Sequence, residues 1–158
     1  RDWGHAKDYA EGMWRILQHD KPEDFVLATG ITTKVRDFIK KAFAEVGIQI
    51  VFEGKEENEV GRFDGYDESI FQSATDISVE DAHLKKGAIL VKIDPEYYRP
   101  TEVDLLIGDA TKAKEKLGWT PQYDLESLVQ QMVSSDVALF KKDVALKNLG
   151  HKVLKQAE

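Results

Sequence analysis

The sequence predicts an α/β domain in which helices flank a small mixed sheet. Segments with helical periodicity alternate along the chain with short apolar runs, which is the pattern of this class. The 158 residues, 42% of them hydrophobic, suffice for one domain with its own core. No G-x-G-x-x-G cluster follows a predicted strand, so the chain lacks a complete dinucleotide-binding unit.

Two helices are predicted in the first third of the chain. Residues 5–18 carry an apolar stripe at steps of three and four: Ala6, Tyr9, Ala10, Met13, Trp14 and Leu17. Gly12 lies within this helix at a cost of about 1 kcal/mol relative to alanine, which indicates close packing against a neighbour. The second helix has its predicted N-cap at Thr33 and ends at Gly47.

Two further helices are predicted near the end, at residues 111–117, closed by Gly118, and at residues 125–142. Short apolar runs predict strands at residues 25–28, 48–52 and 88–93, and a further short segment follows at residues 103–107. The last sixteen residues, 143–158, are predicted to form a frayed helical tail.

Residues 53–87 show no periodicity and hold ten carboxylates against four basic side chains. We therefore expect a long acidic loop at 54–87, inside a domain that spans residues 1–142. A solvated loop explains its carboxylates better than acid–base catalysis does.

Composition excludes several kinds of protein and site. The net charge of −7 argues against nucleic-acid binding, and the apolar runs are too short to span a membrane. Without cysteine there is no disulfide or thiolate chemistry, and the four scattered histidines do not predict a metal site. No signal peptide is visible, which predicts a cytoplasmic location. The chain opens at Arg1 and not at Met, which suggests a fragment, a processed product or a chain seen only in part.

The segment Tyr97-Tyr98-Arg99-Pro100-Thr101-Glu102 is the strongest candidate for ligand binding. Pro100 restricts Arg99 to an extended backbone, and a guanidinium fork suits a diphosphate. Glu102, three residues on, is placed to accept both hydroxyls of a ribose. The alternative interpretation is a surface ion pair between Arg99 and Glu102, which contributes under about 1 kcal/mol.

The opening Arg1-Asp2-Trp3-Gly4-His5 is the second candidate. Arg1 precedes a predicted helix N-terminus, where backbone donors favour anions. Asp2 is equally suited to be the N-cap of that helix, and a lone histidine such as His5 is more often structural than catalytic.

Several strings of the sequence together resemble a known family. They are Arg-Asp-Trp-Gly-His-Ala-Lys-Asp-Tyr at 1–9, Pro-Glu-Asp-Phe-Val-Leu-Ala-Thr-Gly at 22–30, Val-Arg-Asp-Phe at 35–38, Asp-Pro at 94–95, Tyr-Arg-Pro-Thr-Glu-Val at 98–103, Gly-Asp-Ala-Thr-Lys-Ala at 108–113 and Leu-Gly-Trp-Thr-Pro at 117–121. In this order they resemble the extended short-chain dehydrogenase/reductase family, and within it the GDP-mannose 4,6-dehydratases. The resemblance runs from residue 1 to about residue 142.

The resemblance implies that this chain is the C-terminal, substrate-binding domain of a lyase, and that the Rossmann domain of that enzyme is absent from the chain. In the family an N-terminal Rossmann domain binds NADP and carries the catalytic residues, so none is expected in this chain. Hydride transfer through NADP converts GDP-mannose to GDP-4-keto-6-deoxymannose, and members are commonly homo-oligomers. By position, Arg1 and Arg99 match arginines that contact the diphosphate, and Glu102 matches the carboxylate that holds a ribose. We expect exposed apolar area where the Rossmann domain would dock.

Departures from the family pattern leave alternatives open. Lys34 stands where relatives have Ser or Thr, Val60 replaces a basic residue, and Glu96 replaces Arg. The last two make the surroundings of the site less positive. The alternatives are another nucleotide-sugar epimerase or reductase of the same superfamily, and a non-catalytic binding or assembly domain.

Overall fold

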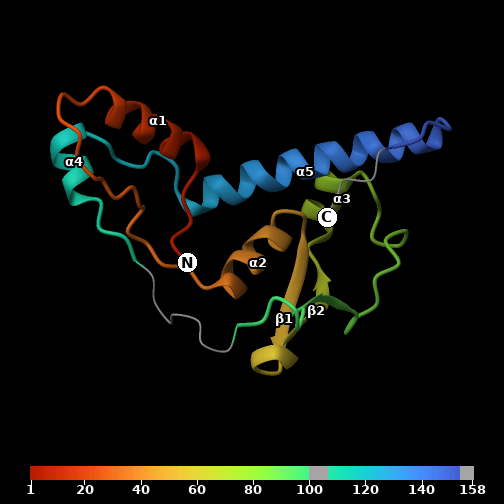
Figure 1. Cartoon of the computed structure of the whole chain (residues 1–158). Coiled ribbons are helices and arrows are strands. Elements are labelled where there is room, and N and C mark those ends of the chain that lie inside the picture. Colours follow the sequence, from red (N-terminus) through yellow and green to blue (C-terminus); the bar gives the residue numbers. More distant parts are fainter. Residues whose placement is uncertain (100–106, 154–158) are drawn as a thin grey trace. The chain divides into compact units, whose positions relative to one another are not determined.

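The computed structural model describes residues 1–99 and 107–153, which fall into two compact units (Figure 1). Arg1–Lys41 and Ile93–Val129 contribute to the first, which we call the helical unit. Ala42–Lys92 and Gln130–Glu158 contribute to the second, which we call the sheet unit. Among the described residues, no helix has the length and apolar character needed to cross a membrane.

Helix α1 (Ala6–Leu17) belongs to the helical unit and confirms the helix predicted at residues 5–18. His5 is its N-cap, and the Nδ1 atom of that ring accepts a hydrogen bond of 3.0 Å from the Lys7 backbone N–H. Gly12 is buried, and a Cβ added there would lie 2.5 Å from Cδ1 of Leu27. The close packing expected at this glycine is therefore confirmed.

The strand predicted at residues 25–28 is wrong: the structure assigns no strand there. Exposure nevertheless alternates along this segment, with Val26 exposed between two half-buried neighbours and Ala28 buried. That alternation is typical of a strand. The alternation of exposed and buried residues is therefore present in this segment. It is not assigned as a strand because no described strand pairs with it through hydrogen bonds.

Helix α4 (Thr111–Leu117) lies where it was predicted and packs near α1 within the helical unit. Asp109 precedes it and accepts hydrogen bonds from the backbone N–H and the hydroxyl of Thr111, at 2.9 and 2.6 Å. These bonds hold the pKa of the Asp109 carboxyl below its usual value. Gly118 ends the helix in the left-handed conformation expected for a C-terminal glycine.

The sheet unit contains three strands in the order β1 (Ile48–Glu53), β2 (Val60–Tyr66) and β3 (Ile89–Lys92), with both neighbouring pairs antiparallel. Bulges interrupt the register between Gln49 and Ile50 and between Gly61 and Arg62. The α/β class with a small sheet and flanking helices is confirmed, and the described strands are all antiparallel where a mixed sheet was expected.

The segment predicted as an acidic loop, 54–87, contains regular structure. It holds a 3₁₀ turn η1 (Glu56–Asn58), strand β2 and helix α3 (Glu68–Thr75). Strand β2 escaped prediction because glycines occupy most of its inward positions, leaving Phe63 as its one buried large side chain. Asp67 is the N-cap of helix α3, its side chain accepts a hydrogen bond from the Ile70 N–H, and the helix buries Phe71.

Helices α2 (Val35–Ala44) and α5 (Leu125–Asn148) each contribute residues to both units. Gly47 follows α2 with a φ of +70°, as predicted, but Thr33 lies two residues before the helix and not at its cap. Helix α5 extends beyond the predicted end at residue 142 and into the segment predicted as a frayed tail. Leu128 and Val129, near its N-terminal end, are buried.

Candidate functional site

Arg1 is held by its backbone against the segment that leads into α2. Its backbone nitrogen donates to the carbonyl of Thr33 at 2.7 Å, and the Thr33 N–H donates to the carbonyl of Arg1 at 2.8 Å. Asp2 and Thr32 form an antiparallel bridge beside this pair. The Arg1 residue is exposed, so a fixed backbone presents its guanidinium at the surface.

Asp2 fixes the turn at Thr29 and Gly30 and is not the N-cap of α1. Its Oδ1 accepts from the backbone N–H and the hydroxyl of Thr29, at 3.1 and 2.6 Å, and its Oδ2 accepts from the Gly30 N–H at 2.9 Å. Gly30 has a φ of +75°, which a glycine adopts without strain. Three donors thus satisfy this carboxylate next to Arg1, and the helix is capped by His5 instead.

Two ring stacks fix the chain between Asp2 and α1. The Trp3 ring stacks on Phe38 of α2 with centroids 4.3 Å apart, and the His5 ring stacks on Tyr123 at 4.2 Å. His5 is buried, with its Nδ1 engaged at the helix cap, as expected for a structural histidine. These contacts give the Arg1 segment a rigid base.

Arg99 is also exposed and belongs to the same helical unit as Arg1. It follows a turn in which the carbonyl of Asp94 accepts from the Tyr97 N–H at 3.1 Å, while Oδ1 of Asp94 accepts from the Glu96 N–H at 3.0 Å. Glu102, the predicted ribose ligand, lies outside the described residues. The roles of Arg1, Arg99 and Glu102 in binding therefore stay predictions.

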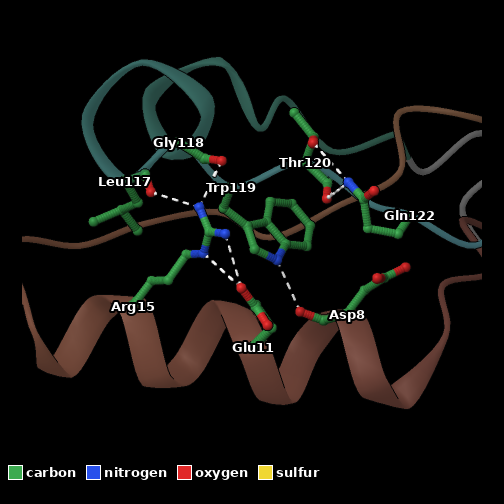
Figure 2. A network of polar contacts seen from close by, with 8 residues as sticks. All are labelled: Asp8, Glu11, Arg15, Leu117, Gly118, Trp119, Thr120 and Gln122. Carbon is green, nitrogen blue, oxygen red and sulfur yellow. Dashed lines mark hydrogen bonds and ion pairs between the residues drawn. The ribbon is translucent and has the colours of Figure 1, made fainter.

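A polar cleft of about 770 Å³ lies between α1 and the segment after α4 (Figure 2). Arg15 crosses it, donating to Oε1 of Glu11 from Nε and Nη2, and from Nη1 to the carbonyls of Leu117 and Gly118 at 3.0 and 2.7 Å. The guanidinium thereby ties α1 to the C-terminal end of α4, where carbonyl groups lack helical partners. The nitrogen atoms of the Arg15 guanidinium are therefore already hydrogen-bonded within the fold.

Asp8 and Trp119 form the floor of this cleft. Trp119 is 1% exposed and its indole Nε1 donates to the carbonyl of Asp8 at 2.8 Å, while Oδ2 of Asp8 accepts from the Tyr123 N–H at 3.1 Å. Burial raises the pKa of the neighbouring Tyr9 hydroxyl, and the negative charges of Asp2 and Asp8 raise it further. The Tyr9 hydroxyl therefore stays protonated at neutral pH.

Sequence reasoning missed the contribution of Asp8 and Arg15. Both lie outside the apolar stripe of α1, yet Asp8 is only 5% exposed and Arg15 contacts backbone 102 residues away. The signal that could have placed them is Gly12, where close packing was expected: it lies on the same side of the helix, one turn from each of them. The Leu117-Gly118-Trp119 string supplies the other half of the contact.

Comparison with known proteins places the chain in a family. The model of the GDP-mannose 4,6 dehydratase family matches residues 1–132. The GDP-mannose 4,6 dehydratase of Homo sapiens is 49% identical over 89% of this chain and 32% of its own length. The GDP-mannose 4,6-dehydratase of Vibrio cholerae is 44% identical over 97% of this chain and 38% of its own length.

GDP-mannose 4,6 dehydratase 2 of Caenorhabditis elegans is 46% identical over 90% of the chain and 32% of its own length. The chain thus spans about a third of the length of the curated relatives that it matches. The match includes Arg1, Arg99 and the Trp119 segment within one continuous stretch of 132 residues. The chain belongs to the GDP-mannose 4,6-dehydratase family.

Proposed function

We propose that the chain is the substrate-binding part of a GDP-mannose 4,6-dehydratase, a lyase that converts GDP-mannose to GDP-4-keto-6-deoxymannose. The continuous family match over residues 1–132 carries this proposal. The relatives bear this enzyme's name, and their identity to the chain holds over roughly nine tenths of it or more. A cytoplasmic enzyme that assembles as a homo-oligomer is part of the same proposal.

In this proposal Arg1 and Arg99 contact the diphosphate of the substrate, and Glu102 holds the ribose hydroxyls. The roles of Arg1 and Arg99 are supported by their exposure and by the backbone hydrogen bonds that fix the segments around them. Arg1 is held at Thr33 beside a carboxylate, Asp2, whose charge is already met by three donors. Arg99 follows a hydrogen-bonded turn and belongs to the same unit. Guanidinium groups pair with phosphate oxygens through two parallel hydrogen bonds, so a diphosphate suits them.

We propose that NADP and the catalytic residues belong to a Rossmann domain of the same protein. This chain does not fit the cofactor, since its glycines include no G-x-G-x-x-G turn after a strand. NADP would supply hydride transfer where it binds, and no step of that chemistry is assigned to the residues here. The role of this chain is to hold the GDP part of the substrate.

The outer side of α1 is the proposed docking surface for the Rossmann domain. Met13, Trp14 and Leu17 are 60%, 59% and 80% exposed, although they form one apolar stripe. The extended segment 25–28 adds the exposed Val26 in the same unit. Apolar side chains of this size are normally covered, and a partner surface within the full-length protein would cover them.

Titration calorimetry with GDP on the full-length protein tests the assignment of the site. Arg99→Ala and Glu102→Ala should each weaken GDP binding by about tenfold to a hundredfold, because each removes hydrogen bonds to or from a charged group. Lys85→Ala is the matched control, since this exposed lysine lies in the sheet unit and its loss should leave affinity unchanged. Unchanged affinity in both site variants would exclude these residues from the site.

The reaction itself is tested by the product formed from GDP-mannose. A GDP-4-keto-6-deoxy sugar, identified by mass and NMR, supports the dehydratase. An epimerised or simply reduced sugar would support another enzyme of the superfamily instead. Binding without turnover by the full-length protein would favour a non-catalytic module.

A further inference from the structure

The segment that carries Arg1 runs antiparallel to residues 29–33 within the helical unit. Arg1 and Thr33 exchange two backbone hydrogen bonds, of 2.7 and 2.8 Å, and Asp2 forms a bridge with Thr32. A two-stranded pair this short has little stability of its own in water. Whatever holds residues 29–33 in place therefore also holds the backbone of Arg1.

The Asp2 side chain holds the turn at the start of residues 29–33. Its Oδ1 accepts from the N–H and the hydroxyl of Thr29, and its Oδ2 accepts from the N–H of Gly30. The Thr29 hydroxyl oxygen accepts in turn from the N–H of Ile31 at 3.2 Å. One carboxylate and one hydroxyl thus bind three successive backbone donors. They fix a turn in which Gly30 has a φ of +75°.

This bonding pattern requires a carboxylate at position 2. Both oxygens of Asp2 accept, and a donor already points at each of them. Asparagine has the same size but only one acceptor oxygen, so its amino group would face a donor of either Thr29 or Gly30. At least one of the three bonds would be lost. The Thr29 hydroxyl is required in the same way, since it donates to Asp2 and accepts from Ile31.

The chain on either side of these bonds is fixed by packing. Ala28 is 7% exposed, and a Cβ added at Gly108 would lie 2.3 Å from its Cβ, so residues 28 and 108 are in close contact. On the far side of Asp2, the Trp3 ring is stacked on a ring of α2. Between these two fixed points, the bonds of Asp2 determine how the chain turns and hence where the backbone of Arg1 lies.

We propose that Asp2 is a positioning residue for Arg1. Its carboxylate fixes the turn that holds the backbone from which the Arg1 guanidinium reaches the substrate diphosphate. This role rests on the proposed function, in which Arg1 contacts that diphosphate. A guanidinium binds phosphate oxygens through two parallel hydrogen bonds, so a small change in its direction weakens both. Asp2 acts on the substrate only through Arg1.

A double-mutant cycle on the full-length protein tests this dependence, with GDP affinity measured by titration calorimetry. Arg1→Ala should weaken GDP binding by about tenfold or more. Asp2→Asn should weaken it by about fivefold when Arg1 is present and by less than about twofold in Arg1→Ala, because its effect passes through the missing guanidinium. A purely structural role would weaken binding equally in both backgrounds. Asp20→Asn, which changes an exposed carboxylate of the same unit, is the control and should leave the affinity unchanged.

Thr29 provides a second test that leaves Asp2 in place. Thr29→Val removes the hydroxyl but keeps the branched shape of the side chain, and it should weaken GDP binding by about threefold, again only when Arg1 is present. Thr29→Ser retains the hydroxyl and should bind GDP as tightly as the wild type. Melting temperatures show which variants are folded at the temperature of the titration. The two Thr29 variants decide the matter alone where Asp2→Asn is too unstable to titrate.

Wild-type affinity in both Asp2→Asn and Thr29→Val would overturn the proposal, and so would equal losses with and without Arg1. A Thr29→Ser variant as weak as Thr29→Val would overturn it too, because the hydroxyl would then have no part in the effect. Each of these results leaves the proposed function standing as long as Arg1→Ala alone weakens GDP binding. If Arg1→Ala binds GDP normally, the proposed contact of Arg1 with the diphosphate fails first, and the positioning role of Asp2 fails with it.

Discussion

The two units differ in what they bury. In the sheet unit, strand β2 and helix α3 enclose aromatic side chains, with Tyr66 between Phe63 and Phe71 at 4.6 Å from each. In the helical unit, α1 turns Asp8 and Gly12 inward and leaves Met13, Trp14 and Leu17 exposed. The buried positions of β2 and α3 are thus aromatic, as is usual for elements that pack on a core, whereas the buried positions of α1 are a carboxylate and a glycine.

This difference shows what holds α1 in place. The inner side of the helix is fixed by hydrogen bonds from Trp119 and Arg15 and by close packing at Gly12, not by a broad apolar contact. The apolar stripe of Met13, Trp14 and Leu17 therefore remains exposed on the opposite side of the helix. A helix with an unused apolar side indicates a unit whose stability increases when that side is covered.

Trp119→Ala should give the largest effect and should be confined to the helical unit. Removing a fully buried indole costs about 3–5 kcal/mol, and the carbonyl of Asp8 loses its donor. Hydrogen exchange followed by mass spectrometry should show lost protection in α1 and α4. Phe71→Ala is the matched change in the sheet unit, where protection in β1 and β2 should fall instead. Equal loss across both units in either variant would show that they unfold as one.

Leu17→Lys tests whether the exposed stripe is covered in the full-length protein. In this chain alone the change should alter the free energy of unfolding by less than about 0.5 kcal/mol, because Leu17 is already exposed. In the full-length protein it should destabilise by about 1.5–3 kcal/mol, the value of burying a leucine. Chemical denaturation of both proteins measures the difference. Gln18→Lys, next on the helix and outside the stripe, should be neutral in both.

Sequence reasoning worked best where local chemistry determines the structure. Helix α1 was predicted from its apolar spacing, and the end of α4 was predicted from Gly118. Strand β1 was predicted from its run of apolar residues. The family resemblance at the opening string, and so the family itself, could also be read directly.

Prediction was less successful where a contact joins distant residues. The stripe of α1 and the close packing at Gly12 could be read from the sequence, but the burial of Asp8 could not, because its partner Trp119 is 111 residues away. Strand β2 was missed because glycines occupy most of its inward positions, and at Gly61 a Cβ would lie 3.0 Å from Val91 and 3.1 Å from Ile50. Such requirements follow from packing and not from periodicity.

Two glycine substitutions sharpen the comparison between the units. Gly12→Ala places a Cβ 2.5 Å from Leu27 and 3.0 Å from Trp119, so overpacking of about 1–3 kcal/mol should exceed the gain of up to about 1 kcal/mol in helix propensity. Gly65→Ala is the matched change in β2, where the nearest atom is 3.6 Å away, and it should stabilise by about 0.5 kcal/mol. Thermal unfolding should therefore shift in opposite directions for the two variants.

The smallest expected effect is a pH dependence that Glu23 gives to the helical unit. Two lysines of α4 hold this carboxylate, Lys116 at 2.6 Å and Lys112 at 3.0 Å. The hydrogen bond from Lys116, followed by that from Lys112, lowers the pKa of Glu23 to about 2 from its usual 4.5. Because the folded-state pKa is the lower one, the contribution to stability is complete above about pH 4.5 and is lost as the pH falls towards 2.

Glu23→Gln removes this contribution, so its melting temperature should lie below that of the wild type at pH 7 and approach it near pH 2. The difference should be small and should shrink in high salt, because the pair is at the surface. The carbon-13 shift of the Glu23 carboxyl follows the titration directly, and Lys116→Gln should raise its midpoint towards 4.5 more than Lys112→Gln does. A midpoint that ignores both lysines would mean that α4 does not hold the Glu23 carboxylate, and that Lys112 holds this segment only at the Asp24 carbonyl and the Phe25 ring.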